Sequence, residues 1–307
     1  MLRYGDLPIP EPATDEVLVR VAAAAVNPID RRLRAGELQE YFTRAFPITP
    51  GWDFSGRIER TGSAVSGWSP GDDVLGLAFT WHLHGGTYAE YACVKAESLA
   101  AKPAPLSWHH AAALPLVSLT AWQALHEYAN VLPGQSVLIQ AGAGGVGSVA
   151  IPMAKHLGAR VYATCGSANV DYVRGLGADH VIDYSKTGYA RIIRQREPEG
   201  LDVVIESLTG EPCVTTAVQL TRSGGTVVYL NNEPPDLPEV SARQIRSTFL
   251  HHRADGPMLA ELVRLYVAGI LRIPPITVRP LTEAADAHRV SESGRTRGKV
   301  VLHVQDL

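Results

Sequence analysis

Cysteine, long apolar runs and an excess of one charge are all scarce or missing in this 307-residue chain. Its 3 cysteines, Cys93, Cys165 and Cys213, lie far apart, which excludes a disulfide framework and a cysteine-rich zinc site. No apolar run approaches the roughly 20 residues that span a bilayer, and the opening residues lack the apolar core of a signal peptide. The net charge of -3 gives no electrostatic reason to expect nucleic acid or an anionic membrane as a partner. We therefore expect a cytoplasmic protein that binds a small molecule.

A glycine-rich segment carries the clearest functional signal. Residues 136–147 run from an aliphatic stretch into Gly142, Gly144 and Gly147, spaced as G-x-G-x-x-G, and residues 148–158 have a helical pattern. In this context the first glycine allows a tight turn, the second admits a pyrophosphate and the third lets helix and strand pack closely. Backbone N–H groups at the helix start favour the anionic phosphates. The sequence therefore predicts a dinucleotide site at Gly142, Gly144, Gly145, Val146 and Gly147.

The chain changes character near residue 115 and again near residue 243. Before residue 115, Gly and Pro separate short apolar runs, a pattern typical of an antiparallel, barrel-like domain. From 115 to 242, apolar strands alternate with helical stretches, the βαβ pattern of a parallel, doubly wound sheet. The predicted class is α/β, with residues 1–114 and 243–307 forming a catalytic domain and residues 115–242 an inserted nucleotide-binding domain.

The residues after the second parallel strand bear on the choice of nicotinamide cofactor. NAD sites carry an acidic residue about 20 positions past the glycines, which binds the ribose 2′-hydroxyl. Here Ser167 follows the strand, and no acid occurs until Asp171. We therefore favour NADPH over NADH and expect hydroxyl donors from Ser167 and from Tyr184, after the third strand. A site without an acidic residue is compatible with either cofactor, so a comparison of the Michaelis constants for NADPH and NADH decides between them.

Seven short motifs occur in a fixed order along the chain: residues 26–30 (VNPID), 50–56 (PGWDFSG), 71–74 (GDDV), 85–91 (GGTYAEY), 119–121 (LTA), 142–147 (GAGGVG) and 297–302 (RGKVVL). With these motifs the chain resembles the medium-chain dehydrogenase/reductase superfamily, and within it the zinc-independent quinone oxidoreductase branch. The resemblance covers nearly the whole length. It implies a GroES-like antiparallel β-barrel catalytic domain, an inserted Rossmann domain and a homodimer. Relatives usually open with a further strand before residues 2–6, so it also implies an unpaired barrel edge.

The positions of the zinc ligands differ from those of the superfamily's zinc alcohol dehydrogenases. Those enzymes carry a cysteine at the position of Asn27, Gly-His-Glu in place of Gly51-Trp52-Asp53, and usually a cysteine near Leu116. Catalytic zinc requires about three converging protein ligands, and all three positions are changed. Paired histidines such as His109 and His110 are expected to be solvated or locally hydrogen-bonded. The resemblance therefore implies a member without bound metal.

Without zinc, hydride is expected to pass to an acceptor that is already electrophilic. The resemblance implies transfer from NADPH to a quinone or an α,β-unsaturated carbonyl, with the protein supplying position and a few donors. It also implies that Asn27 donates a hydrogen bond to the acceptor oxygen. The equally weighted alternative is that Asn27 stabilises the turn before Pro28, and Asp30 is expected to fix local structure.

The proton donor is open at this stage. Enoyl reductases of the wider family carry a tyrosine soon after the Asn motif, whereas this chain has Arg32 and Arg34 there. Tyr41, in a shifted position, is one candidate, and a surface or core role for it is at least as well supported. His84 is the other candidate, because imidazole suits proton transfer at neutral pH.

Four further side chains complete the expected cofactor site. By resemblance Thr120 approaches the nicotinamide, or else serves as a helix-start hydroxyl. Ser207 and Asn231 follow the fourth and fifth strands, where ligands bind in such sheets. Lys299 is expected to reach the cofactor phosphate or to lie exposed beside a strand.

Two rival functions remain. An enoyl-thioester reductase is supported by the basic residues Arg31, Arg32 and Arg34, and disfavoured by the missing tyrosine. An NADPH-binding regulatory protein with little turnover is the other.

Overall fold

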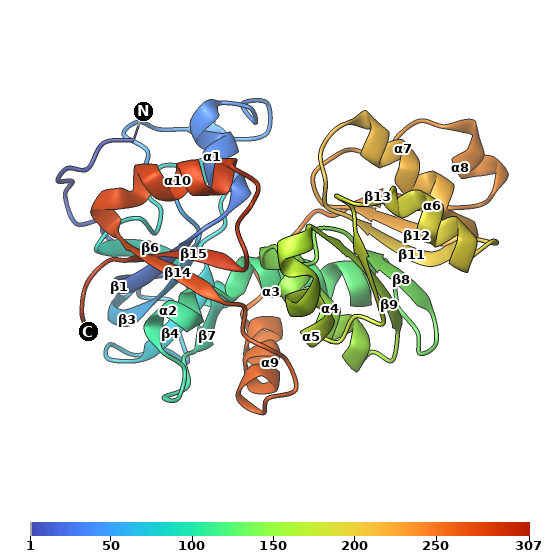
Figure 1. The fold of residues 1–307 in the computed structure, drawn as a ribbon. Coiled ribbons are helices and arrows are strands. Elements are labelled where there is room, and N and C mark those ends of the chain that lie inside the picture. The colour runs from blue at the N-terminus through green and yellow to red at the C-terminus, as the bar shows by residue number, and fades with distance from the viewer. Residues whose placement is uncertain (1) are drawn as a thin grey trace. The chain divides into compact units, whose positions relative to one another are not determined.

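The computed structural model describes residues 2–307 and divides them into two compact units (Figure 1). Unit 1 contains residues 2–119, 253–269 and 273–307, and unit 2 contains residues 120–252 and 270–272. The return to unit 1 comes after residue 252 rather than 242, because a sixth parallel strand, β13 (Arg246–Phe249), still belongs to unit 2. Within residues 2–307 no helix is both long enough and apolar enough to cross a membrane.

Unit 1 is built on a seven-stranded sheet, ordered β14-β15-β1-β3-β4-β7 with β6 also paired to β1. Every pairing is antiparallel except the parallel pair β14 and β15. The strands are β1 (Glu16–Val26), β3 (Asp53–Thr61), β4 (Asp73–Leu77), β6 (Tyr91–Lys95), β7 (Leu99–Ala101), β14 (Ile276–Pro280) and β15 (Lys299–His303). The largely antiparallel character predicted for the catalytic domain is confirmed.

Strand β1 holds this sheet together, because it pairs with three other strands. Its first half pairs with β6 and its second half with β15, while β3 pairs along its whole length. Its run of Val, Leu and Ala is almost completely buried, as expected for a strand covered on both faces. Residues from the two ends of the chain therefore share one core.

Helices and a small second sheet complete unit 1. Strands β2 (Thr43–Arg44) and β5 (His82–Leu83) form a separate parallel pair. The helices are α1 (Pro28–Ala35), the 3-10 helix η1 (Ala96–Ser98), α2 (Trp108–Ala112), α9 (Gly256–Val267), η4 (Leu281–Glu283) and α10 (Ala284–Glu292). Helix α10 packs on α1 (Figure 1). Helix α3 (Pro115–Trp122) contains the point where the chain passes into unit 2.

Unit 2 contains a six-stranded parallel sheet in the order β10-β9-β8-β11-β12-β13. Counted along the chain this is strand order 3-2-1-4-5-6, the order of the doubly wound Rossmann sheet, which confirms the predicted class. The strand order reverses between β8 and β11, and ligands of such sheets bind beyond the carboxyl ends of the strands at that point. The first five strands are β8 (Ser136–Ile139), β9 (Arg160–Cys165), β10 (His180–Asp183), β11 (Leu201–Glu206) and β12 (Thr221–Tyr229).

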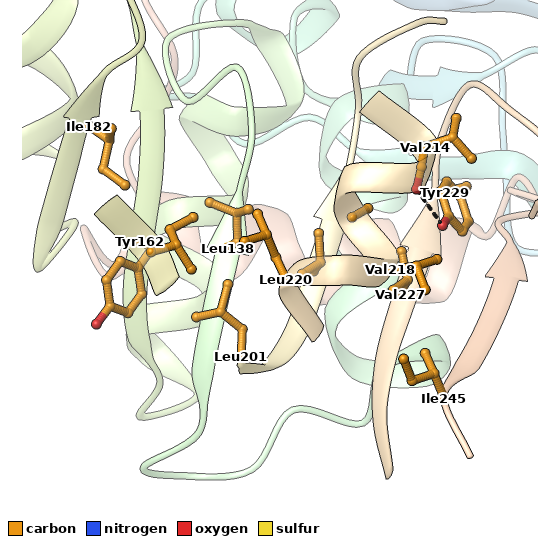
Figure 2. Close-up of a cluster of buried hydrophobic side chains, with 13 residues drawn as sticks. Leu138, Tyr162, Ile182, Leu201, Val214, Val218, Leu220, Val227, Tyr229 and Ile245 are labelled. Atoms are coloured by element: carbon orange, nitrogen blue, oxygen red, sulfur yellow. Dashed lines mark hydrogen bonds between the residues drawn. The ribbon is translucent and has the colours of Figure 1, made fainter. Parts of the chain in front are cut away.

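The helices of unit 2 cover this sheet and bury an apolar core. They are η2 (Gln123–Tyr128), α4 (Gly145–His156), η3 (Ser167–Asn169), α5 (Val170–Gly175), α6 (Tyr189–Arg196), α7 (Glu211–Leu220) and α8 (Pro238–Ala242). Figure 2 shows one cluster, in which Leu138, Leu220 and Val227 are buried. The Tyr229 hydroxyl donates a hydrogen bond to the Val214 carbonyl oxygen at 3.2 Å, so the polar atom of this buried tyrosine has a partner.

Candidate functional site

The candidate residues fall into two groups, one in each unit. In unit 1 they surround the start of α1, and in unit 2 they follow the carboxyl ends of the parallel strands.

A buried ion pair lies at the centre of the unit 1 group. The Lys299 ammonium, at the start of β15, donates to Asp53 Oδ2 at 3.1 Å, to the Val26 carbonyl and to Asn27 Oδ1. The Asn27 amide donates to Asp53 Oδ2 at 2.8 Å, and the Leu116 backbone N–H donates to Asp53 Oδ1 at 2.7 Å. The Lys299 and Asp53 side chains are 3% and 0% exposed. All three ammonium hydrogens are therefore used inside unit 1.

This geometry bears on two sequence predictions. Lys299 is not the exposed charge considered above, because it is buried against Asp53. Its contact with a cofactor phosphate stays a prediction. Asn27 is 1% exposed, and both ends of its carboxamide are bonded within the unit, which favours its structural alternative. The role of Asp53 was missed, although a charged residue at the start of an apolar strand signals a buried partner.

Asp30 joins the start of α1 to the barrel. Its Oδ2 accepts the Asn27 backbone N–H at 2.8 Å and the Tyr88 hydroxyl at 2.9 Å, and Asp30 is 1% exposed. The first contact caps the helix start. Burial raises the pKa of Asp30 to about 7, although both donors oppose the shift. Burial also raises the pKa of Tyr88 well above its usual value, assisted by the neighbouring Asp30.

His288, on α10, lies against this pair. Its ring packs edge-on against Tyr88, with ring centroids 5.8 Å apart. Its Nδ1 lies 3.3 Å from Arg34 Nη1, and Arg34 also forms an ion pair with Glu292. Burial lowers the pKa of His288 to about 4, and the nearby Arg34 acts in the same direction. His288 is therefore neutral at physiological pH.

A cavity of about 160 Å³ in unit 1 is bordered by Asp30, Trp52 and His84. Asp30 Oδ1 is buried and has no hydrogen-bond partner among residues 2–307. His84 is exposed, and its Nδ1 lies 3.1 Å from the Ala45 carbonyl oxygen. Because a carbonyl can only accept, Nδ1 carries the proton and Nε2 is left for other partners.

Trp52, which by the resemblance stands where zinc enzymes of the superfamily have a histidine ligand, belongs to an aromatic cluster. Trp52 is 3% exposed, and its ring packs against Phe42 and Phe79, with centroids 5.9 and 5.0 Å away. Trp81 stacks on Phe42 at 5.2 Å. Tyr41 is 58% exposed, and it is not among the residues that line the cavity within residues 2–307. The structure thus places His84, but not Tyr41, beside the cavity that Asp30 borders.

In unit 2 the glycine turn connects β8 to α4. Ala141 adopts a φ of 48°, and the Gly144 N–H donates to the Ala141 carbonyl at 2.9 Å. A Cβ at Gly147 would lie 2.4 Å from the Ala141 oxygen and 2.6 Å from Gly142 Cα, so the close packing of helix and turn requires glycine. Helix α4 begins at Gly145, which leaves its first N–H groups directed beyond the strand end. This cradle fits a pyrophosphate.

The sequence next to Ser167 contains no acidic residue, but the fold brings one to it from the next strand. The Ser167 hydroxyl donates to Asp183 Oδ2 at 2.5 Å, so the proton expected to serve the cofactor is already used. Asp183 ends β10, and it pairs in register with Cys165 at the end of β9. Parallel neighbours end at one edge of a sheet, which brings the two segments together. Tyr184 is 57% exposed, with its hydroxyl 3.4 Å from where a Cβ of Gly166 would lie.

The strand ends at the point of reversal also carry polar side chains. The Ser207 hydroxyl donates to the Gln140 carbonyl at 3.1 Å, which ties the end of β11 to that of β8. The Asn231 amide donates to the Ser207 carbonyl at 2.6 Å, so these two predicted residues are brought together. Gln140, which the sequence reasoning missed, also accepts the Ser207 N–H at 3.3 Å. Thr120, in α3, is 7% exposed.

No group of three or more His, Cys, Asp or Glu side chains gathers as metal ligands within the part of the chain that the structure describes. His109 and His303 contact each other at 3.2 Å, and His110 contacts the Ser107 hydroxyl at 2.9 Å. These histidines have local partners.

Comparison with known families matches two models. The model described as alcohol dehydrogenase GroES-like domain matches residues 13–104, which lie in unit 1. The model described as zinc-binding dehydrogenase matches residues 176–302, which span the second half of unit 2 and the end of unit 1.

Individual relatives cover nearly the whole chain. A chloroplastic quinone-oxidoreductase homolog of Spinacia oleracea is 34% identical over 98% of this chain and 93% of its own. A chloroplastic NADPH-dependent alkenal/one oxidoreductase of Arabidopsis thaliana is 32% identical over 97% of this chain and 75% of its own. Among solved structures, the quinone oxidoreductase from Coxiella burnetii is 33% identical, with a TM-score of 0.85 over 98% of this chain and 94% of its own.

Proposed function

This chain belongs to the zinc-independent quinone oxidoreductase branch of the medium-chain dehydrogenase/reductase superfamily, and on that premise we propose that it passes hydride from NADPH to quinones or α,β-unsaturated carbonyls. The buried Lys299–Asp53 pair carries this proposal. Asn27, at the position where zinc enzymes of the superfamily carry a cysteine ligand, bonds both members of this pair. An ammonium fixed by three acceptors does not ionise an alcohol as a metal does, so reduction of an electrophilic acceptor is the fitting direction.

We propose that unit 2 holds NADPH. The start of α4, beside the glycine turn, would bind the pyrophosphate, because the first N–H groups of a helix have no partner within the helix. Ser167 and Tyr184 would face the adenosine end, and Thr120, Ser207 and Asn231 the nicotinamide end. The cofactor supplies the hydride when bound. The relative named as an NADPH-dependent alkenal/one oxidoreductase supports this cofactor.

The chain's own part is to position the acceptor and to deliver a proton. His84 is the proposed proton donor, because it borders the cavity and its Nδ1 is fixed by the Ala45 carbonyl. Its Nε2 would then hold the transferable proton in the imidazolium form. Asn27 would contact the acceptor oxygen only by giving up its bond to Asp53, so its structural role is the one we propose, and Tyr41 is the weaker candidate for the proton. A homodimer is also part of the proposal, and sedimentation equilibrium would measure twice the chain mass of 33.0 kDa.

One experiment separates this proposal from its rivals. The purified chain is titrated with NADPH by fluorescence, and oxidation of NADPH is then followed with a panel of quinones, enones and enoyl thioesters, with and without a chelator. Quinone and enone turnover that resists chelation is expected. Failure to bind NADPH would sink the proposal, and loss of activity with the chelator would overturn its zinc-free basis.

The same panel tests the two alternatives. Preference for enoyl thioesters would select a thioester reductase, but Arg32 and Arg34 already form ion pairs with Glu37 and Glu292. Those pairs reduce the positive charge left for the phosphates of a carrier. Binding without oxidation of NADPH by any acceptor would select a regulatory protein.

A further inference from the structure

Ser167 lies where NAD sites place the acid that binds the ribose. That acid follows the second parallel strand, about 20 positions past the glycines, and Ser167 follows β9 at this distance from Gly147. Its hydroxyl is 2.5 Å from Asp183 Oδ2. A carboxylate therefore reaches the ribose position from the third strand instead of the second.

Three donors hold that carboxylate in place. Ser167 donates to Oδ2, and the Ser185 hydroxyl and its backbone N–H donate to Oδ1, the latter at 3.0 Å. These hydrogen bonds lower the pKa of Asp183, so it carries a full charge at neutral pH. Its side chain is 12% exposed, which leaves it in reach of a ligand.

The cations near this carboxylate offset its charge only weakly. Lys186 lies 3.7 Å from Asp183 Oδ2, but its side chain is 74% exposed, and such pairs are screened by water and salt. Arg174 bonds Asp171 at 2.5 Å. Residues 164–170, which follow and include the end of β9, contain no Lys or Arg. A ribose 2′-phosphate here meets a fixed negative charge, whereas a 2′-hydroxyl meets a hydrogen-bond acceptor.

We propose that Asp183 determines nucleotide specificity at the adenosine end of the site. Its carboxylate accepts a hydrogen bond from the 2′-hydroxyl of NADH and repels the 2′-phosphate of NADPH, so the chain binds both cofactors and prefers NADPH only weakly. This inference rests on the proposed function, because it assigns the ends of the dinucleotide in unit 2. It adds a residue, Asp183, that opposes binding of the 2′-phosphate and that the sequence pattern did not reveal.

The test compares dissociation constants of NADPH and NADH by fluorescence titration for the wild type, Asp183→Asn and Glu199→Gln. Glu199 is an exposed acid just before the amino end of β11, whereas Asp183 ends β10, so its variant controls for the change in net charge. Asp183→Asn is expected to shift the affinity ratio toward NADPH by at least about fivefold, since a like charge is removed. Glu199→Gln is expected to leave the ratio unchanged.

An unchanged ratio in Asp183→Asn, or an equal shift in Glu199→Gln, would overturn the inference. Asp183→Ser serves as a second neutral variant if the Asn variant melts below the wild type, and it must shift the ratio in the same direction. Failure of the wild type to bind either nucleotide would instead overturn the proposed function. The two failures are therefore distinct.

Discussion

At the scale of single residues, the buried charges define unit 1. Lys299 and Asp53 are almost fully removed from water, and each is compensated by the other and by amide groups. Removal of one partner from such a pair is costly because the remaining charge stays buried. Asp30, with a pKa of about 7, and His288, with a pKa of about 4, lie close by and respond to pH in opposite directions.

Lys299→Met is expected to lower the free energy of unfolding by about 3 kcal/mol or more, because Asp53 would stay buried without its counter-ion. Urea denaturation measures the loss. Lys186→Met removes a lysine that is 74% exposed and should change stability by less than about 1 kcal/mol. Equal effects of the two substitutions would contradict a structural role for the pair.

Asp30→Asn is expected to change how stability depends on pH. The folded-state pKa of about 7 is above the unfolded value of 3.8, so the stability that protonated Asp30 contributes is complete below pH 3.8 and is lost as pH rises through 7. The variant has no such loss. Relative to wild type, its free energy of unfolding should rise by about 3 kcal/mol from pH 5 to pH 8.

Urea titrations of both proteins at the two pH values make this measurement. His288 is present in both, so its opposite response cancels in the comparison. Asp171→Asn, at a side chain that is 96% exposed, is the control and should show no such pH dependence. If Asp30→Asn and Asp171→Asn showed the same dependence of stability on pH, a raised pKa at Asp30 would be contradicted.

At the scale of elements, the glycine turn links the sequence motif to packing. Its third glycine is required by contact distances alone, since a Cβ there would overlap the backbone of Ala141 and Gly142. The turn therefore depends on glycine for its shape as well as for access to phosphate.

Gly147→Ala is expected to weaken NADPH binding at least about tenfold, because α4 must shift away from the turn and misplace its N–H groups. Gly188→Ala is the matched control, since a Cβ there meets nothing within 4 Å and its φ of -62° suits alanine. Fluorescence titration with NADPH compares the two. Wild-type affinity in Gly147→Ala would show that the turn does not bind the cofactor.

The elements also show what the sequence can and cannot predict. The aliphatic stretch before the glycine turn and the helical pattern after it follow directly from local patterning, and they occur as β8 and α4. Strand β13 was missed because its residues, Arg-Ser-Thr-Phe, carry no apolar run. The Ser167–Asp183 and Lys299–Asp53 contacts join residues far apart in the chain. Such contacts depend on strand order and register, which local patterns do not encode.

At the scale of the whole molecule, unit 1 depends on both ends of the chain. Strand β15 lies between β14 and β1, and it also supplies Lys299. Unit 2 is formed mainly from one continuous segment, residues 120–252. The two units therefore respond differently to truncation.

Deletion of residues 299–307 is expected to unfold unit 1 while unit 2 keeps its structure, because the central sheet loses a strand and Asp53 loses its counter-ion. Limited proteolysis with mass spectrometry should recover a resistant fragment near residues 120–252. Deletion of Asp306 and Leu307 alone leaves β15 intact and should behave as the full chain. Equal protease resistance in both truncations would contradict the dependence of unit 1 on β15.

The split origin of unit 1 has a consequence for biosynthesis. During translation, β1 is made about 270 residues before β15. At roughly 5 to 20 residues per second, its second half waits about 15 to 55 s for that partner, while unit 2 can already fold. In that interval an apolar strand edge stays open to other nascent chains. A holdase chaperone that shields the first segment should therefore raise the yield of folded protein.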